Sequence, residues 1–249
     1  MKMKKSLVIS VLALLVAVAA FVKDYLPCAK QAADSAQATV SGNVDVEAVL
    51  KEHPEYVVNA LQAFENKARE EMEAQAKALV KASEKALVED NAPYHGAKDS
   101  EIVMVEFYDY ACGYCRRLYP ELNQILAKNS DVKVLYRPLA FVSPYSEYAA
   151  KAVLAANEQG KFNELLTALF TVQKPLSEEL VDELAEKAGL DVAKMKEDMK
   201  SDKVSTAFEA NNALAEKIQI GGVPTLILNG EMLQPSPDFI QNKINEAKK

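Results

Sequence analysis

Cysteine and histidine are scarce in this chain of 249 residues, which has three cysteines and two histidines. A small secreted domain held together by disulfides needs several cysteine pairs, so three cysteines exclude that class. A structural zinc site needs four ligands. The chain has one Cys-x-x-Cys pair, at Cys112 and Cys115, and its histidines, His53 and His95, are distant from it in sequence. The pair therefore predicts something other than structural zinc, and we expect no bound metal.

Blocks of positive charge are also missing beyond the first five residues. The net charge is −7, and acidic and basic residues are interspersed along the chain. A nucleic-acid-binding protein normally carries a basic stripe, so nucleic acid is excluded as the main partner. Hydrophobic residues make up 49% of the chain, which is ample for a packed globular core.

Residues 1–22 have the pattern of a secretory signal peptide. Lysines in "MKMKKS" precede an uncharged apolar run from Leu7 to Val22. This run is a little shorter than the roughly 20 residues of a spanning helix, and an uncleaved anchor is the alternative. Either interpretation predicts that the rest of the chain is exported. Residues 31–43 are small and polar, and we predict a flexible leader over residues 23–43, which include the isolated Cys28.

Residues 44–90 are predicted to be helical. A short helix is predicted from Val44 to roughly Lys51, with Asp45 able to cap it, and Pro54 suits the first position of a second helix. No glycine or proline interrupts Glu55–Val88, a length on the order of 50 Å as a helix. Such a helix exceeds the usual globular length, so we predict a stalk that joins two or three chains, with packing onto its own domain as the alternative. Its apolar residues recur every three or four positions, at Val57, Leu61, Phe64, Ala68, Met72 and Leu79.

Residues 91–249 alternate between strand and helix patterns and predict an α/β domain. The turn-rich stretch 91–99 marks its boundary. A buried strand in 101–110 precedes a helix over 113–128, and a second strand follows over 132–139. Residues 146–220 have a helical pattern throughout, which predicts a helical insertion at about 145–220. Residues 223–233 predict a hairpin with an Asn-Gly turn, and a capped helix closes the chain.

The dithiol lies where a strand gives way to a helix, which is the arrangement that redox chemistry needs. Cys112 precedes the helix, where unpaired N–H groups and the helix dipole favour a thiolate. Thiolate is the nucleophile in disulfide exchange. Cys115, one turn later, can resolve a mixed disulfide. A purely structural disulfide would close a four-residue ring and stabilise the fold weakly, so we predict redox function.

Two separated motifs, "VEFYDYACGYC" and "GGVPTLILNG", resemble the DsbA-type, thioredoxin-fold thiol–disulfide oxidoreductases of the bacterial envelope. The resemblance covers roughly residues 92–249. It implies a thioredoxin-like fold with an inserted helical domain and a periplasmic location. The helical segment before it resembles the oligomeric members, in which an N-terminal segment joins two or three catalytic domains and favours isomerase activity.

The resemblance also implies roles for individual residues. Cys112 matches the attacking cysteine and Cys115 the resolving one. Pro224 matches the cis-proline that faces the active site, where the Val223 backbone pairs with an extended substrate segment. Glu106 matches the buried acid that helps to move the proton of the resolving cysteine. A lone glutamate inside an apolar strand is costly without such a role.

The dipeptide between the cysteines bears on the direction of the reaction. Gly113 and Tyr114 match the pair in dedicated disulfide isomerases of the envelope, whereas Val223 is typical of oxidases. We predict isomerase activity at least equal to oxidase activity, with no cofactor. The expected partners are secreted proteins with cysteines and a DsbB-like or DsbD-like membrane redox protein. The alternative functions are an envelope chaperone and a copper-handling protein, since two thiolates also suit Cu(I).

Overall fold

The computed structural model describes residues 45–89 and 92–249, which form two compact units, one ending at Glu65 and the other spanning Asn66–Lys249. The predicted signal peptide (1–22) and leader (23–43) lie outside the described residues. Within the described ranges, none of the helices combines the length and the apolar character needed to cross a membrane.

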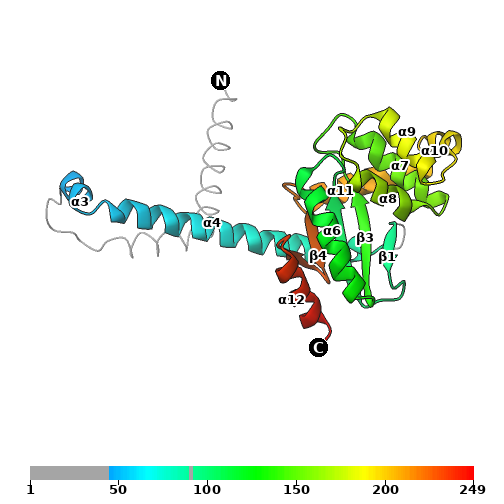
Figure 1. Ribbon diagram of the computed structural model, residues 1–249. Coiled ribbons are helices and arrows are strands. Elements are labelled where there is room, and N and C mark those ends of the chain that lie inside the picture. Colours follow the sequence, from blue (N-terminus) through cyan, green and yellow to red (C-terminus); the bar gives the residue numbers. More distant parts are fainter. Residues whose placement is uncertain (1–44, 90–91) are drawn as a thin grey trace, which may run out of the picture. The chain divides into compact units, whose positions relative to one another are not determined.

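A five-stranded sheet forms the centre of the larger unit (Figure 1), and its strands lie in the order β1-β3-β2-β4-β5. Strands β2 and β3 run parallel, and every other neighbouring pair is antiparallel. Their inner position in the sheet explains why β2 and β3 are almost entirely buried, because both of their faces are covered. The strand bounds are β1 Tyr94–Gly96, β2 Ile102–Tyr108, β3 Val132–Pro138, β4 Thr225–Leu228 and β5 Glu231–Leu233.

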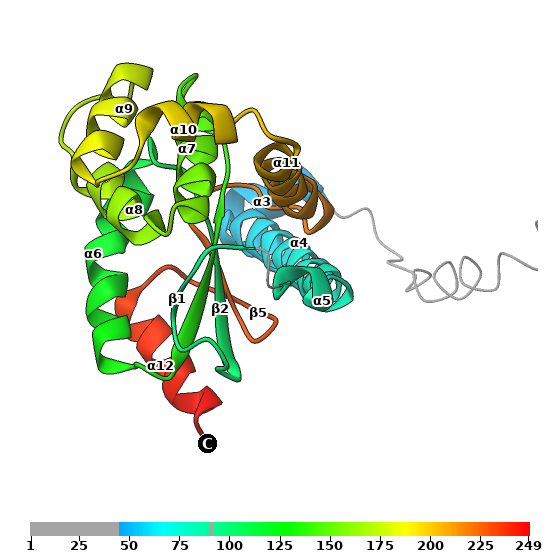
Figure 2. The same cartoon turned by 90° about the vertical axis from the view of Figure 1, so that its right-hand side faces the viewer.

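Helices cover both faces of this sheet, as Figure 2 shows. Helices α6 (Gly113–Lys128) and α12 (Pro237–Ala247) contact each other on one side, and α5 (Glu84–Leu87) lies on the other. The helical insertion adds five helices between β3 and β4. They are α7 (Ser146–Glu158), α8 (Phe162–Thr171), α9 (Glu178–Lys187), α10 (Val192–Asp198) and α11 (Asp202–Lys217).

The alternation of side chains along β2 divides the core into two clusters. Met104 and Tyr108 pack on the side of α6 and the helical insertion. Val105 and Phe107 pack on the opposite face with Leu87. Residues of one strand point alternately to the two faces, so Glu106 shares the face of Met104 and Tyr108. The sequence therefore directs this carboxylate toward the α6 side of the sheet.

The predicted fold class, a thioredoxin-like α/β fold with a helical insertion, is confirmed. Helix α6 has the predicted bounds, and the insertion runs from Ser146 to Lys217. The predicted hairpin turn has positive φ at both Asn229 (46°) and Gly230 (81°), as a tight Asn-Gly turn requires. Residues 94–96, which the sequence assigned to a turn-rich boundary, form β1 instead, because β3 supplies an antiparallel partner.

The first N-terminal helix lies within two residues of its predicted bounds, and the second begins as predicted but ends earlier. Asp45 caps α3 (Val46–Glu52) by accepting hydrogen bonds from two backbone N–H groups. Helix α4 spans Glu55–Ala82, and a separate short helix, α5, follows it. Val80 and Leu87 are buried in the core cluster that contains Phe107. The compact unit therefore starts at Asn66, and the predicted boundary at 90/91 falls within it.

Gly96 offers a test of how β1 is held to the sheet. Its φ is +94°, and a Cβ at this position would lie 2.1 Å from the Val132 carbonyl oxygen. We expect Gly96→Ala to lower the free energy of unfolding by roughly 2–4 kcal/mol, from backbone strain and overpacking together. Gly222→Ala, where a Cβ meets no atom within 4 Å, is the matched control and should change it little. Urea unfolding of both variants measures the difference, and equal stabilities would contradict the strained close approach.

Candidate active site

Cys112 occupies the junction between the central strand and α6. It is the N-cap residue of the helix, in extended conformation, and its backbone N–H donates to the Asp109 carbonyl 3.1 Å away. The side chain is 7% exposed. Both cysteines are free thiols. The N-terminus of a 16-residue helix thus meets the Cys112 sulfur, and a helix N-terminus is a common setting for a nucleophilic cysteine.

Cys115 lies one turn further along α6 and is fully buried. Burial raises the pKa of its thiol, and the neighbouring Cys112 and Glu106 add to the rise. A hydrogen bond from the backbone at Asp109 acts in the opposite direction. The inner thiol therefore stays protonated at neutral pH, and it needs a proton acceptor before it can attack a disulfide.

The predicted proline comes to the dithiol from the other end of the domain. The Val223–Pro224 peptide bond is cis, and the Cys112 thiol donates to the Val223 carbonyl with an Sγ–O distance of 3.3 Å. A groove of about 500 Å³ runs past this contact. It is lined by Tyr114, Arg117, Leu118, Glu121, Gly222, Val223, Pro224 and Pro235. Three of the predicted residues, Tyr114, Val223 and Pro224, therefore line the groove, and Cys112 contacts one of them, Val223. Gly113 lies between Cys112 and Tyr114 in the chain.

Glu106 is 1% exposed, and neither of its carboxyl oxygens has a hydrogen-bond partner within the described part of the chain. Burial raises its pKa from 4.5 to about 8. It pairs in register with Tyr136 of β3 and Leu226 of β4, on the α6 side of the sheet. A carboxyl group with this pKa can hold or release a proton near neutral pH, as the chemistry of Cys115 requires.

Asp109 is a residue of the site that the sequence analysis missed. Its fully buried carboxylate accepts hydrogen bonds from the N–H groups of Ala111, Phe141 and Val142 and from the Ser146 hydroxyl, at 2.7–2.9 Å. It thereby ties the loop after β3 to the residues just before Cys112. The signal in the sequence was an acidic residue placed between a buried strand and the dithiol.

The aromatic residues near the dithiol belong to the core. Tyr108 and Tyr110 are fully buried, their hydroxyls are 2.8 Å apart, and both rings contact Phe170 of α8. Tyr119 stacks on the same ring with a centroid distance of 4.7 Å. Burial raises the pKa of Tyr108 and Tyr110 well above 10, so both stay neutral. These rings join the helical insertion to the site and leave Tyr114, which is 70% exposed, as the aromatic residue of the groove.

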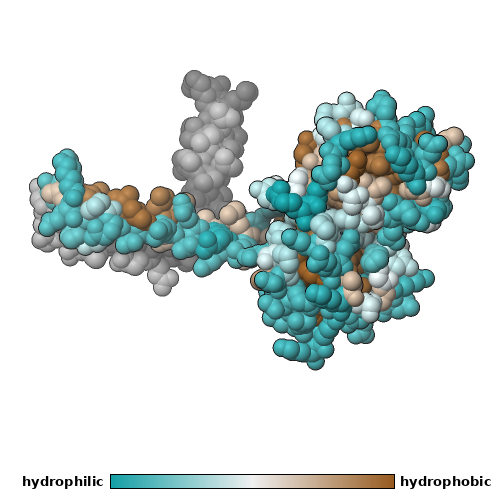
Figure 3. Space-filling view, in the orientation of Figure 1, coloured by the Kyte–Doolittle hydropathy of each residue, from teal (hydrophilic) through white to brown (hydrophobic). Residues whose placement is uncertain are grey.

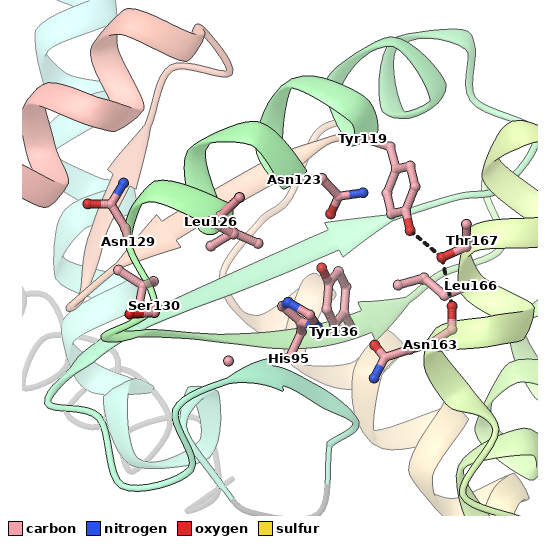
Figure 4. Close-up of a pocket in the computed structure, with 13 residues that line it drawn as sticks. His95, Tyr119, Asn123, Leu126, Asn129, Ser130, Tyr136, Asn163, Leu166 and Thr167 are labelled. Carbon is pink, nitrogen blue, oxygen red and sulfur yellow. Dashed lines mark hydrogen bonds between the residues drawn. The ribbon is translucent and has the colours of Figure 1, made fainter.

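A second pocket, of about 460 Å³, lies between α6, β1 and α8 (Figure 4). Polar side chains line much of it, and the Tyr119 hydroxyl bonds Thr167 at its rim. Tyr136, the register partner of Glu106, forms part of its wall. None of the predicted site residues lines this pocket, so the reactive chemistry is assigned to the groove beside Pro224. Its other labelled residues are His95, Asn123, Leu126, Asn129, Ser130, Asn163 and Leu166.

A dithiol before a helix, opposite a cis-proline on a mixed five-stranded sheet, defines a thioredoxin-like protein. Residues 103–245 match the DSBA-like thioredoxin domain, and the chain belongs to this family. The match covers more than half of the chain and includes every predicted site residue.

Solved structures support the same fold. A thioredoxin-like oxidoreductase from Silicibacter pomeroyi is 29% identical with a TM-score of 0.63, and the match covers 66% of this chain and 96% of that one. A linker-deletion mutant of ScsC from Proteus mirabilis is 26% identical with a TM-score of 0.68, over 80% of this chain and 95% of that one. BcfH from Salmonella enterica Typhimurium has a TM-score of 0.71 at 21% identity, over 94% of this chain and 100% of that one, which is a likeness of fold.

Curated relatives match only one segment. The Na(+)/H(+) antiporter NhaA 3 of Salinispora tropica is 29% identical over 143 residues, which are 57% of this chain and 22% of the antiporter. NhaA of Herminiimonas arsenicoxydans is 31% identical over 144 residues, 57% of this chain and 23% of the antiporter. The chain spans about a fifth of the length of these relatives.

The raised pKa of Glu106 predicts how stability depends on pH. The folded chain keeps a proton on this carboxyl up to about pH 8, whereas the unfolded chain releases it near 4.5. Stability is therefore greatest below 4.5 and is lost as the pH rises through 8, by on the order of 3–5 kcal/mol for this group. We expect Glu106→Gln to remove most of this loss, because the amide does not ionise.

Urea unfolding of the reduced protein at pH 5, 7 and 9 measures the effect. Glu121→Gln, at an exposed position of α6, is the matched control and should retain the pH dependence of the wild type. A wild-type stability that is level across this range would show that Glu106 ionises normally.

Proposed function

We propose that this protein is an exported thiol–disulfide oxidoreductase that acts on cysteines of other proteins. The contact between the Cys112 Sγ and the Val223 carbonyl at 3.3 Å carries the proposal. A carbonyl in this place leaves a backbone edge beside the sulfur, where an extended substrate segment can add hydrogen bonds. The substrate sulfur is thereby brought to Cys112, which lies at the N-terminus of α6.

The chemistry follows from the two thiols. In isomerisation, the Cys112 thiolate attacks a substrate disulfide, a Cys112–substrate S–S bond forms, and the other substrate sulfur leaves as a thiolate. A second substrate thiolate then attacks the mixed disulfide and releases Cys112, so no net oxidation occurs. In oxidation, a substrate thiolate attacks Cys112 of the Cys112–Cys115 disulfide. Cys115 leaves as a thiolate and takes up a proton that Glu106 can supply. The second substrate thiolate then attacks the substrate sulfur of the mixed disulfide, so that a substrate S–S bond forms, Cys112 leaves as a thiolate, and the dithiol has gained two electrons.

Replacement of each cysteine separates their roles. We expect Cys115→Ser to accumulate a mixed disulfide when it is mixed with a disulfide-containing peptide, because Cys112 attacks the peptide disulfide, one peptide sulfur leaves as a thiolate, and no second thiol resolves the product. Cys112→Ser should react at least 100-fold more slowly, because its remaining thiol is buried and protonated at neutral pH. Mass spectrometry of the adducts after acid quenching measures both, and a peptide adduct on Cys115 of the wild type would contradict the assignment.

We propose that the N-terminal unit joins two or three copies of the chain and thereby favours isomerase activity. Its helices have no buried side chain in residues 45–65. In Figure 3, apolar side chains gather along the N-terminal half of α4. Val57, Leu61 and Phe64 are 52%, 56% and 70% exposed, and their spacing places them on one helix face. A solvent-exposed stripe of this kind marks an association surface.

The relatives fit a separate N-terminal module. ScsC from Proteus mirabilis is described in a compact and a transitional conformation and as a linker-deletion mutant. Several dithiols held in one assembly would let a substrate that has left one site be recaptured by another at high effective concentration. Repeated capture suits the reshuffling of wrong disulfides, and the Gly113-Tyr114 dipeptide points in the same direction.

A charged substitution within the apolar stripe of α4 tests whether this stripe forms an interface between chains. We expect Leu61→Lys to reduce the assembly to single chains, because the substitution buries an unpaired charge in the interface. Asn59→Lys, on the opposite face of the helix, is the matched control and should leave the mass unchanged. Analytical ultracentrifugation gives the mass. Reactivation of scrambled ribonuclease should fall several-fold with Leu61→Lys, while oxidation of a small dithiol peptide stays at the wild-type rate.

A deletion that tests the same point has to stop at Glu65. Residues up to Leu87 contribute to the core, so a longer truncation would damage the catalytic domain itself. An unchanged mass after removal of residues 1–65, or full ribonuclease reactivation by a single-chain form, would exclude the proposed role of this unit.

The proposed setting is the periplasm, with secreted proteins as substrates and a DsbB-like or DsbD-like membrane protein as the redox partner. The predicted signal peptide supports export. Which partner acts depends on the resting state of the dithiol, since an isomerase has to be kept reduced and an oxidase has to be kept oxidised.

A further inference from the structure

The groove beside Pro224 contains a positive charge for which the proposed chemistry has no use. Most of its wall is apolar or backbone, and its two charged side chains, Arg117 and Glu121, both come from α6. Arg117 follows the dithiol by two residues and is exposed. It therefore faces any polypeptide that lies along the groove while its cysteine reacts with Cys112.

The guanidinium of Arg117 is held over the dipeptide between the two cysteines. Its Cζ lies 4.4 Å from the centroid of the Tyr114 ring. Its Nη1 lies 3.7 Å from the position that a Cβ on Gly113 would occupy. A cation held on an aromatic face loses less conformational freedom when it binds a ligand than a side chain that extends freely into water.

The donors of Arg117 are available for a ligand. Among residues 45–89 and 92–249 no carboxylate forms an ion pair with it, although Glu121 lies four positions away on the same helix. Arg116 differs in this respect, because its guanidinium donates to the carbonyls of Tyr110 and Val172 and fixes the loop after α8. The adjacent arginines thus have different environments, one bonded within the fold and the other directed to the groove.

We propose that Arg117 is a specificity residue that selects substrate segments with an acidic side chain close to the reacting cysteine. The inference rests on the proposed function. A segment paired with the Val223 backbone advances about 3.3 Å per residue, so the side chains within two positions of its cysteine pass the guanidinium. Arginine binds a carboxylate through two parallel hydrogen bonds, a geometry that amides and hydroxyls do not match.

Glu121 adds a preference for one orientation of a charged substrate segment in the groove. It lies one helical turn beyond Arg117 along α6, further from the cysteines, and lines the same groove. An acidic residue is attracted close to the dithiol and repelled one turn away, whereas a basic residue experiences the reverse. The pair of opposite charges therefore favours one orientation of a charged substrate segment over the other.

The test uses peptides that contain one cysteine and differ by a single isosteric change, Asp against Asn, at each of the two positions on either side of that cysteine. The measured quantity is the second-order rate constant for reaction of the reduced peptide with the oxidised protein. Rates with a small disulfide such as oxidised glutathione correct for the effect of the aspartate on the peptide thiol itself. The variants are Arg117→Gln and, as the matched control, Lys128→Gln, which removes the same charge about 16 Å away on the same helix.

We expect the wild type to prefer the Asp peptide by about threefold to tenfold at low salt at one or more positions. The preference should disappear in Arg117→Gln, persist in Lys128→Gln and shrink in 0.5 M salt. Glu121→Gln should increase it slightly. An equal loss of rate for Asp and Asn peptides in Arg117→Gln, together with a shifted pH profile of Cys112 alkylation, would overturn the proposal, because the charge would then act on the sulfur instead of on the substrate.

A wild type that reacts with both peptides and shows no preference at any position would also overturn it. If the oxidised wild-type protein reacts with neither peptide faster than oxidised glutathione reacts with it, the result would instead count against the proposed function. The two failures are therefore distinguishable within one set of measurements.

Discussion

The active site of this molecule depends on one contact, between the Cys112 sulfur and the Val223 carbonyl. Cys112 lies where the central strand β2 leads into α6, and the Val223 carbonyl reaches it from a segment more than a hundred residues later in the chain. Between them in the chain, β3 completes the centre of the sheet, and the helical insertion packs its Phe170 on Tyr108 and Tyr110. The Val223 carbonyl that accepts from the Cys112 thiol directly precedes the cis bond to Pro224. A site assembled from distant parts of the sequence is also one that depends on the complete fold.

The two thiols of the site differ in how deeply they are buried and in the groups that lie near them. Cys112 lies at a helix N-terminus and is 7% exposed, whereas Cys115 is fully buried, with a protonated Glu106 on the same side of the sheet. Burial of a carboxyl group without a hydrogen-bond partner lowers stability at neutral pH, and no packing requirement explains its presence in an otherwise apolar strand. Its retention fits a group that exchanges protons with Cys115. Asp109 makes the opposite use of burial, since its four hydrogen bonds satisfy the carboxylate fully and fix the backbone around the site.

Patterns among neighbouring residues in the sequence were sufficient to predict most of the fold and the dithiol at the centre of the site. The apolar run of β2, the bounds of α6 and the Asn229-Gly230 turn depend on neighbours in sequence, so periodicity and turn chemistry were sufficient to predict them. The failures depend on partners that are distant in the chain. Residues 94–96 become a strand only because β3 accepts them, α4 ends at Ala82 where Val80 enters the core, and Asp109 acquires its role from Phe141 and Val142. The approach of Val223 to Cys112 came from the family resemblance, because no pattern of spacing reveals it.

The two arginines after Cys115 illustrate how the same residue type takes two functions in one turn of helix. The i, i+1 offset of about 100° turns Arg116 toward the helical insertion and Arg117 toward the groove. The first side chain closes hydrogen bonds with carbonyls of the fold and is half-buried, and burial lowers its pKa. The second keeps its donors exposed on the Tyr114 ring. A charge that stabilised the fold would be expected to find a partner within it. An unpaired charge fixed beside the reactive sulfur instead has its partner in the substrate, so recognition and chemistry share the first two turns of α6.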